Sequence, residues 1–243
     1  MYPEIRMEDG AWEWCNGGIP QLANKTAHAA KIKRDIAARN VSAAYDGYVV
    51  VDYESWRARW NTTNPLYHNA SIRLELAENP GMSLEEATAA AVGRYNEAAL
   101  DFMTLTLEAF QAVLPAARLG FYGYPTFGYW DVNLTTVHTL NDQLVPLWEA
   151  STALFPSVYE PYMSGVDEPY SMNLAYVNGT IHEAVRCAGL HDGPALPVAP
   201  YTWYRYHDGE PHGLEFLTTE DLALEMNFPR TLPGVSGAVM WGN

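Results

Sequence analysis

The alternation of short apolar runs with longer amphipathic stretches is the feature that most constrains how this chain folds. Apolar runs short enough for buried strands occur at 48–51, 119–124, 157–159, 195–201 and 237–241. Stretches with helical spacing lie around and between them, at 26–38, 83–115, 140–154, 176–188 and 218–226. Strands that alternate with helices are typical of parallel βα units, so we expect an α/β fold.

The number of predicted strands is small for the length of the chain. A chain of 243 residues fits one βα barrel, which normally has about eight strands, whereas the pattern predicts five. The residues up to Pro20 are predicted to be irregular, with a turn at Asn16-Gly17-Gly18, and add no strand. The longest helix has a clear start, because Ser83 and Glu86 have the spacing of a capping box.

The charge balance excludes two classes of partner. Lys and Arg number 14 and Asp and Glu 29, so the formal net charge is 14 − 29 = −15. A field of this sign repels polyanions, so we expect no binding to nucleic acid and none to anionic membrane surfaces. The sequence has no run of 18 apolar residues, so no membrane span is predicted. The hydrophobic share of 48% predicts a packed core rather than disorder.

Cysteine number and glycosylation motifs point to different compartments. Two cysteines, Cys15 and Cys187, are too few for a disulfide framework or a four-cysteine zinc site. Chance predicts roughly one or two Asn-x-Ser/Thr tripeptides in such a chain. Six occur, at Asn24, Asn40, Asn61, Asn69, Asn133 and Asn178. The excess favours the secretory route, although the first residues lack the basic and apolar regions of a signal peptide. Either a leader lies outside this sequence or the tripeptides are coincidence.

Two acids follow the first predicted strand directly. Val51 leads into Asp52 and Glu54, which would share one face if the strand continued. Catalytic groups project from the carboxyl ends of strands in βα barrels. Mutual repulsion and burial would raise the pKa of one of the two acids and make it a general acid. The alternative, that both are solvated loop residues, stays open. Arg57 is either a surface charge or the partner that keeps one carboxylate ionised.

Aromatic residues gather at the other predicted strand ends. Tyr122 and Tyr124 end the second strand, and Tyr159 and Trp241 lie at the ends of later ones. Aromatic rings with a polar edge suit sugar stacking and hydroxyl contacts, although any one of them could equally pack in the core. His182-Glu183 lacks the second histidine of a zinc protease helix, and no phosphate loop, dinucleotide fingerprint or serine hydrolase elbow occurs. We therefore expect neither a metal nor another cofactor.

Several motifs together resemble the hyaluronidases, glycoside hydrolase family 56. They occur in the family's order over nearly the whole chain: 17–21 (GGIPQ), 52–57 (DYESWR), 120–125 (GFYGYP), 141–144 (NDQL), 154–159 (LFPSVY) and 237–241 (GAVMW). The resemblance implies a distorted (β/α) TIM-like barrel, with residues 1–243 forming a single catalytic domain. It also implies a secreted or lysosomal protein whose partner is a glycosaminoglycan polysaccharide.

The resemblance also assigns roles to individual residues. The family cleaves hyaluronan or related polymers as a retaining endo-β-N-acetylhexosaminidase, in which the substrate's acetamido oxygen acts as the internal nucleophile. Glu54 matches the general acid/base, and Asp52 matches the acid that holds the acetamido group. The matching substrate-binding residues are Tyr122, Tyr159, Trp241, Arg57 and Ser157.

The chain departs from the family pattern at several points. Ala58 replaces a proline, Thr126 an aspartate of the cleft wall, and Thr180 an arginine. The two strands that precede the GGIPQ segment in the family are not predicted here, so we expect a barrel truncated at both ends. The alternatives are a catalytically inactive carbohydrate-binding protein and another acetamido-assisted glycosidase of the chitinase kind. The net charge of −15 also weakens attraction of a carboxylate-rich polymer unless local arginines reverse the field.

Overall fold

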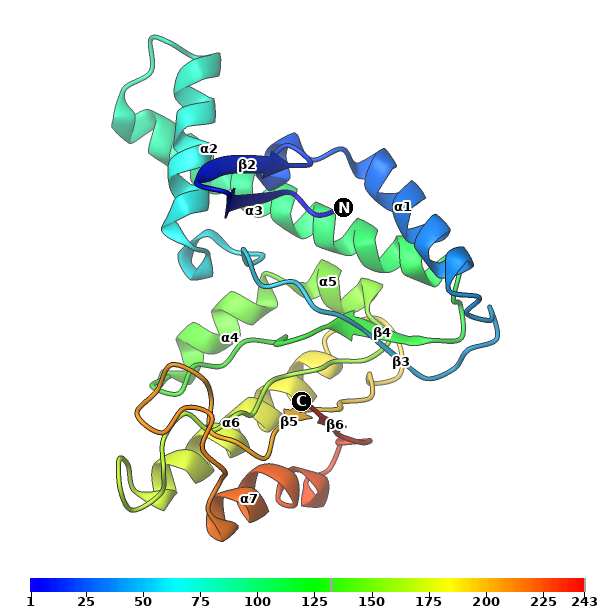
Figure 1. Ribbon diagram of the computed structural model, residues 1–243, viewed down its shortest axis with the longest axis vertical. Coiled ribbons are helices and arrows are strands. Elements are labelled where there is room, and N and C mark those ends of the chain that lie inside the picture. Colours follow the sequence, from blue (N-terminus) through cyan, green and yellow to red (C-terminus); the bar gives the residue numbers. More distant parts are fainter. Residues whose placement is uncertain (132, 243) are drawn as a thin grey trace. The chain divides into compact units, whose positions relative to one another are not determined.

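The chain divides into two units, and the division falls inside the acidic motif. The computed structural model describes residues 1–131 and 133–242, shown as a ribbon in Figure 1. Unit 1 comprises Met1–Gly47 and Tyr53–Ala117, and unit 2 comprises Tyr48–Asp52 together with the chain from Arg118 onward. Asp52 therefore belongs to unit 2 and Glu54 to unit 1.

Unit 1 begins with a β-hairpin that corrects the expected irregular start. Strand β1 (Glu4–Glu8) pairs antiparallel with β2 (Ala11–Cys15), with Glu4 opposite Cys15. The two turn residues Asp9 and Gly10 have φ of 50° and 78°. An Asp-Gly pair with positive φ at both positions is the favoured two-residue hairpin turn. The sequence contains this signal, and the flanking residues alternate charged with apolar side chains over 4–8 (EIRME), so the hairpin follows from the pattern that the expectation of an irregular start passed over.

The rest of unit 1 is helical. Helices α1 (Lys25–Ala38) and α2 (Pro65–Glu78) both pack on the long helix α3 (Leu84–Gln111), as Figure 1 shows. The predicted capping box is confirmed, because Ser83 Oγ accepts from Glu86 N and the Glu86 carboxylate accepts from Ser83 N. Helix α2 was not predicted from the apolar pattern. Its start is marked instead by Asn64, which caps the helix, and by Pro65 in the first turn. Two 3₁₀ turns complete the unit, η1 (Pro20–Leu22) and η2 (Trp60–Thr62).

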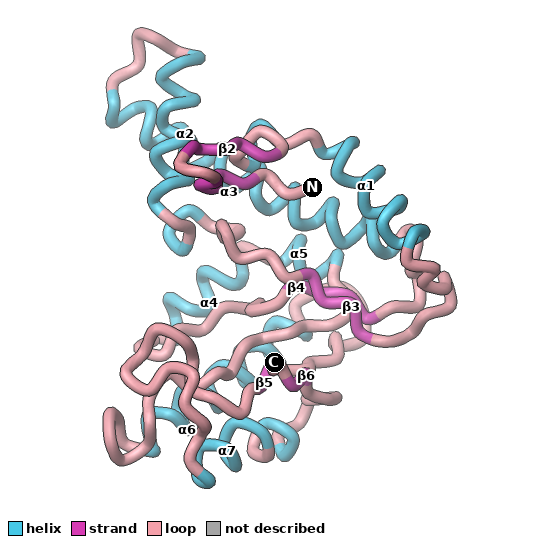
Figure 2. The backbone as a smooth tube through the Cα atoms, viewed as in Figure 1, coloured by secondary structure: helices cyan, strands magenta, loops and turns pink. Residues whose placement is uncertain are grey.

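Unit 2 contains a series of parallel segments that pair in chain order. Strand β3 (Tyr48–Val51) pairs with β4 (Arg118–Phe121), and β5 (Tyr201–Thr202) pairs with β6 (Val239–Met240). Parallel bridges connect these pairs through the segment at 154–157: Tyr122 to Phe155, Leu154 to Val198, and Ser157 to Tyr201. Figure 2 draws much of this array as loop, with short strands at its two pairs. The predicted mixed α/β architecture is confirmed.

The helices of unit 2 differ from the prediction at one place. Helices α6 (Tyr170–Ala188) and α7 (Thr219–Met226) pack together through Val177, Ile181 and Leu224, and the 3₁₀ turn η3 (Pro229–Thr231) follows. The single helix expected at 140–154 is wrong. It is divided into α4 (Leu134–Asp142) and α5 (Val145–Ala150), with Pro146 in the first turn of α5. Among the described residues, no helix combines the length and apolar character that a membrane span requires.

Candidate active site

The carboxyl ends of the parallel segments in unit 2 carry a series of polar and aromatic side chains. Each of five consecutive segments contributes at this edge: Asp52 after β3, Tyr122 after β4, Ser157 and Tyr159 in the next segment, Tyr201 in β5, and Trp241 after β6. Parallel pairing in chain order places these ends along one edge of the array. This is the edge at which open and closed parallel α/β folds bind their ligands.

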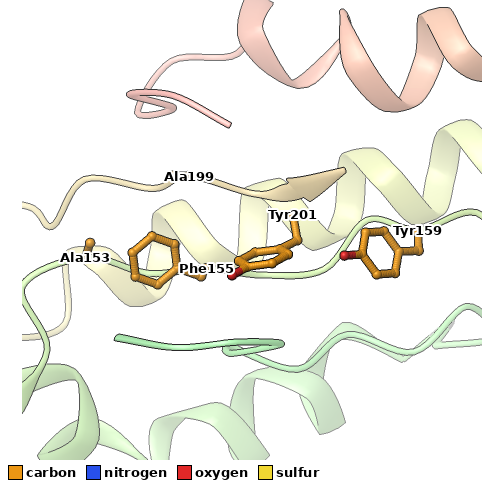
Figure 3. Packing of buried hydrophobic residues seen from close by; sticks show 5 residues of the cluster. All are labelled: Ala153, Phe155, Tyr159, Ala199 and Tyr201. Carbon is orange, nitrogen blue, oxygen red and sulfur yellow. The ribbon is translucent and has the colours of Figure 1, made fainter. Parts of the chain in front are cut away.

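Tyr122 contacts several of these side chains. Its hydroxyl donates to Ser157 Oγ at 3.4 Å, and its ring lies 6.1 Å from the ring of Tyr159 and 4.8 Å from that of Tyr201. Figure 3 shows the rings of Phe155, Tyr201 and Tyr159 following one another in a row beside Ala153 and Ala199. The predicted residues Tyr122, Ser157 and Tyr159 are therefore brought together.

Tyr201 lies in the candidate site, although the sequence motifs did not single it out. Burial raises the pKa of its hydroxyl to about 12, and the charge of Asp52 adds to the effect. Asp52 follows β3 and Tyr201 lies in β5, so both belong to the same edge of the parallel array. The available signal was the position of Tyr201 at the end of the strand predicted over 195–201.

Glu54 and Arg57 lie in unit 1, in the loop that follows β3. Strand β3 ends at Val51, so the strand alternation expected for Asp52 and Glu54 does not extend to them. Both acids are exposed rather than buried, and the Glu54 side chain keeps 53% of its surface. Arg57 Nη2 lies 3.7 Å from Glu54 Oε2, a weak pair at this exposure. The Arg57 backbone is held by Thr63 Oγ1, which accepts from Arg57 N at 2.8 Å.

A network of buried carboxyl groups supports the segment that carries Tyr159. Glu160, Asp221 and Glu225 are each fully buried. Glu225 accepts backbone hydrogen bonds from Glu160 N at 2.9 Å and Trp203 N at 2.5 Å. Asp221 accepts from the Tyr206 hydroxyl at 2.5 Å and from Ser164 N at 3.1 Å. Burial, and then the charges of Glu225 and Asp221, raise the pKa of Glu160 to about 10.

Trp241 is one of the residues that line a pocket in the same unit. Its backbone N donates to Thr202 O at 2.8 Å, while 47% of the residue remains exposed. The pocket has a volume of about 270 Å³ and is lined by Trp203, Tyr204, Arg205, Leu214 and Trp241.

The structure shows the environment of two residues that depart from the family pattern, Thr126 and Thr180. Thr126 N donates to Asn141 Oδ1 at 3.3 Å, and Asn141 in turn donates to Glu183 Oε1 at 2.8 Å. Thr180 is 2% exposed within α6. Thr126 is thus part of a polar network, and Thr180 is a buried residue of its helix.

The chain is similar to known proteins in sequence and in structure. The sequence model of the family described as hyaluronidase matches residues 1–243. Human Hyaluronidase-1 is 33% identical over 236 residues, which cover 93% of this chain and 52% of that protein. Hyaluronidase conohyal-P1 of Conus purpurascens is 30% identical over 248 residues, which cover 100% of this chain and 50% of that protein. The chain thus spans about half the length of these relatives.

A solved structure extends the likeness to three dimensions. The crystal structure of bee venom hyaluronidase in complex with a hyaluronic acid tetramer matches with a TM-score of 0.87 at 28% identity. The match covers 100% of this chain and 76% of that one.

Proposed function

The chain belongs to the hyaluronidase family, glycoside hydrolase family 56, and from this premise we propose that it cleaves hyaluronan or a related glycosaminoglycan. The observation that carries the proposal is the row of Asp52, Tyr122, Tyr159 and Tyr201 at the carboxyl ends of consecutive parallel segments. Rings and hydroxyls in such a row suit a chain of sugars. The bee venom relative, whose structure contains a hyaluronic acid tetramer, supports the same substrate class.

We propose that Glu54 supplies the proton chemistry. In the first step the Glu54 carboxyl protonates the glycosidic oxygen while the acetamido oxygen of the substrate attacks C1 and the C1–O bond breaks. In the second step the Glu54 carboxylate takes a proton from water, the water oxygen bonds to C1, and the bond from the acetamido oxygen opens. Two displacements at C1 give retention of configuration. The exposure of Glu54 leaves it open to both a substrate and water.

Asp52 and Tyr201 would hold the group that acts as the nucleophile. A carboxylate and a phenol at one edge of the array match the N–H and the oxygen of an acetamide. Attack by the acetamido oxygen places positive charge on this group, and a nearby carboxylate stabilises that charge. This arrangement explains how retention would proceed without a second carboxylate as nucleophile.

The remaining parts of the proposal concern fold and location. The chain-order pairing of parallel segments in unit 2 supports a distorted βα barrel. Six glycosylation motifs support a secreted or lysosomal protein.

The test is a panel of substrates assayed for new reducing ends. Hyaluronan, chondroitin and chitin oligomers are each incubated with the chain, and the anomer released first is identified by NMR. We expect products from hyaluronan or chondroitin with the β anomer appearing first. Products from chitin alone would indicate a chitinase-like activity. Binding to a polymer without any product would favour the second candidate, a catalytically inactive carbohydrate-binding protein, for which the departure at Thr126 is the supporting observation.

A further inference from the structure

The pocket beside Trp241 contains a charged group as well as aromatic walls. Trp203, Tyr204 and Trp241 form its rings, Leu214 its aliphatic part, and Arg205 its cation. Sugar sites combine aromatic faces with a few fixed polar groups in this way. The pocket is therefore suited to a sugar with an anionic substituent.

The guanidinium of Arg205 is held in place by its neighbours. Nη1 donates to Leu214 O at 2.8 Å. The guanidinium carbon lies 4.7 Å from the ring centre of Phe216 and 5.7 Å from that of Tyr204. Leu214 adopts φ of 69°, a conformation that a residue with a side chain takes at a cost. That conformation accompanies the turn which presents the Leu214 carbonyl to Arg205.

The local backbone explains why Arg205 and Phe216 face each other. The two residues form an antiparallel bridge at the base of the 205–216 loop. Tyr206 N donates to Glu215 O at 3.0 Å, and Leu217 N donates to Tyr204 O at 3.1 Å. Because the loop closes on itself, the cation is fixed before any ligand arrives.

Among the residues that the structure describes, none cancels the charge of Arg205 by an ion pair. Its polar contact is to a carbonyl, and within the described residues no carboxylate forms an ion pair with it. Two guanidinium edges in a fixed plane match a carboxylate, which they bind by parallel hydrogen bonds. A site of this kind creates local attraction for an anion although the chain carries a net charge of −15.

The pocket adjoins the proposed active site along unit 2. The ring of Trp203 lies 5.8 Å from that of Tyr159 and 6.4 Å from that of Tyr204. Trp203 therefore contacts the row of tyrosines on one side and the pocket on the other. A polysaccharide bound along the tyrosines would place a neighbouring sugar in the pocket.

We propose that this pocket is a subsite for the uronic acid unit of a glycosaminoglycan, with Arg205 binding the carboxylate and the aromatic side chains packing on the sugar ring. The inference rests on the proposed function and names the sugar that distinguishes this substrate class from neutral polymers. An N-acetylglucosamine unit has no carboxylate, so Arg205 would give it no advantage.

The test compares two ligands and three proteins by calorimetry. The ligands are a hyaluronan hexasaccharide and the same hexasaccharide with its carboxylates reduced to alcohols. The proteins are the parent, Arg205→Met, which keeps a stem of similar shape, and Arg230→Met. Arg230 is an exposed cation of η3 in the same unit, so its loss changes the net charge equally.

We expect Arg205→Met to weaken binding of the natural hexasaccharide by about tenfold, as for a lost charge-assisted hydrogen bond. The reduced hexasaccharide should bind the parent and Arg205→Met equally, and Arg230→Met should behave as the parent. Equal binding of the natural ligand by the parent and Arg205→Met would overturn the inference. If Arg205→Met fails to fold, equal affinity of the parent for the two ligands would overturn it.

The same measurements separate this inference from the proposed function. The parent protein could bind the natural hexasaccharide more tightly than the reduced one and yet release no reducing ends. This result would support the uronic acid subsite and contradict the proposed hydrolase activity. A parent that binds neither ligand would contradict both.

Discussion

Glu225 of helix α7 accepts a hydrogen bond from the backbone N–H of Glu160, with 2.9 Å between Oε2 and N. Its other oxygen accepts from Trp203 N at 2.5 Å. Glu160 follows Tyr159 directly, and Trp203 follows Tyr201 by two residues. One buried side chain thus ties together the two segments that carry the central tyrosines of the candidate site.

Replacement of Glu225 by Gln should destabilise the fold. The Gln amide has one acceptor oxygen, so one of the two buried N–H groups would lose its partner. We expect the free energy of unfolding to fall by about 1–3 kcal/mol, measured by urea denaturation. Glu220→Gln on the exposed side of the same helix is the control and should change little. Equal stability of the two variants would show that the Glu225 contacts contribute nothing.

Glu160 should make stability depend on pH in a defined direction. Its pKa is raised from 4.5 to about 10 in the folded protein, so its contribution is complete below pH 4.5 and is lost as pH rises towards 10. Burial raises the pKa of Glu225 as well, which acts in the same direction. The pKa of Asp221 is lowered in the folded protein, so Asp221 has the opposite effect on stability. Its contribution to the free energy of unfolding is lost as the solution becomes acidic.

The variant that tests this is Glu160→Gln, which keeps the shape and cannot ionise. Between pH 5 and pH 8 the parent should lose stability relative to the variant, by at most about 1.4 kcal/mol per pH unit. Urea unfolding of both proteins at the two pH values measures the difference. A difference between parent and variant that does not change with pH would contradict a raised pKa for Glu160.

Tyr201→Phe should lower the turnover rate and leave the stability of the fold almost unchanged. The ring keeps its contact with Tyr122, whereas the hydroxyl proposed to bind the acetamido oxygen is lost. We expect the turnover rate to fall by about tenfold or more, with a change in unfolding free energy below about 1 kcal/mol. Tyr170→Phe, at an exposed position of α6, is the matched control. An unchanged turnover rate in Tyr201→Phe would contradict a role for the Tyr201 hydroxyl in the reaction.

Glycan occupancy should follow the exposure of the motifs. Asn24, Asn40 and Asn133 are exposed together with their partners Thr26, Ser42 and Thr135, whereas Asn178 is half-buried and its partner Thr180 is 2% exposed in α6. We expect glycans at the first three sites and none at Asn178 when the chain is made in a secretory host. Mass spectrometry after enzymatic release in heavy-oxygen water marks each occupied asparagine. Absence of glycans from all three exposed sites would speak against the secretory route.

The parts of the fold that local sequence determines were predictable. Strand β3 has the predicted bounds, because three β-branched residues in a row favour a buried strand. Helix α3 begins at its capping box, which needs side chains only three residues apart. The motif tyrosines Tyr122 and Tyr159 lie where the strand ends were expected, and they do contact each other.

The parts that depend on distant contacts were not predictable from pattern alone. Glu160, Asp221 and Glu225 are charged residues that a hydrophobic pattern assigns to the surface, yet all three are buried. Glu225 accepts from backbone N–H groups 22 and 65 residues away, and Asp221 accepts from one that is 57 residues away. Arg205 likewise gains its role from the closure of the 205–216 loop, which no residue pattern announces.

The central claim is that Glu54 performs the acid and base steps, and the turnover of Glu54→Gln tests it most directly. The control is Asp46→Asn, an exposed acid just before β3, and circular dichroism establishes that both variants retain the fold. We expect Glu54→Gln to release reducing ends from hyaluronan about 10²–10⁴-fold more slowly than the parent, with Asp46→Asn unchanged. A folded Glu54→Gln variant that digests hyaluronan as fast as the parent would contradict the account.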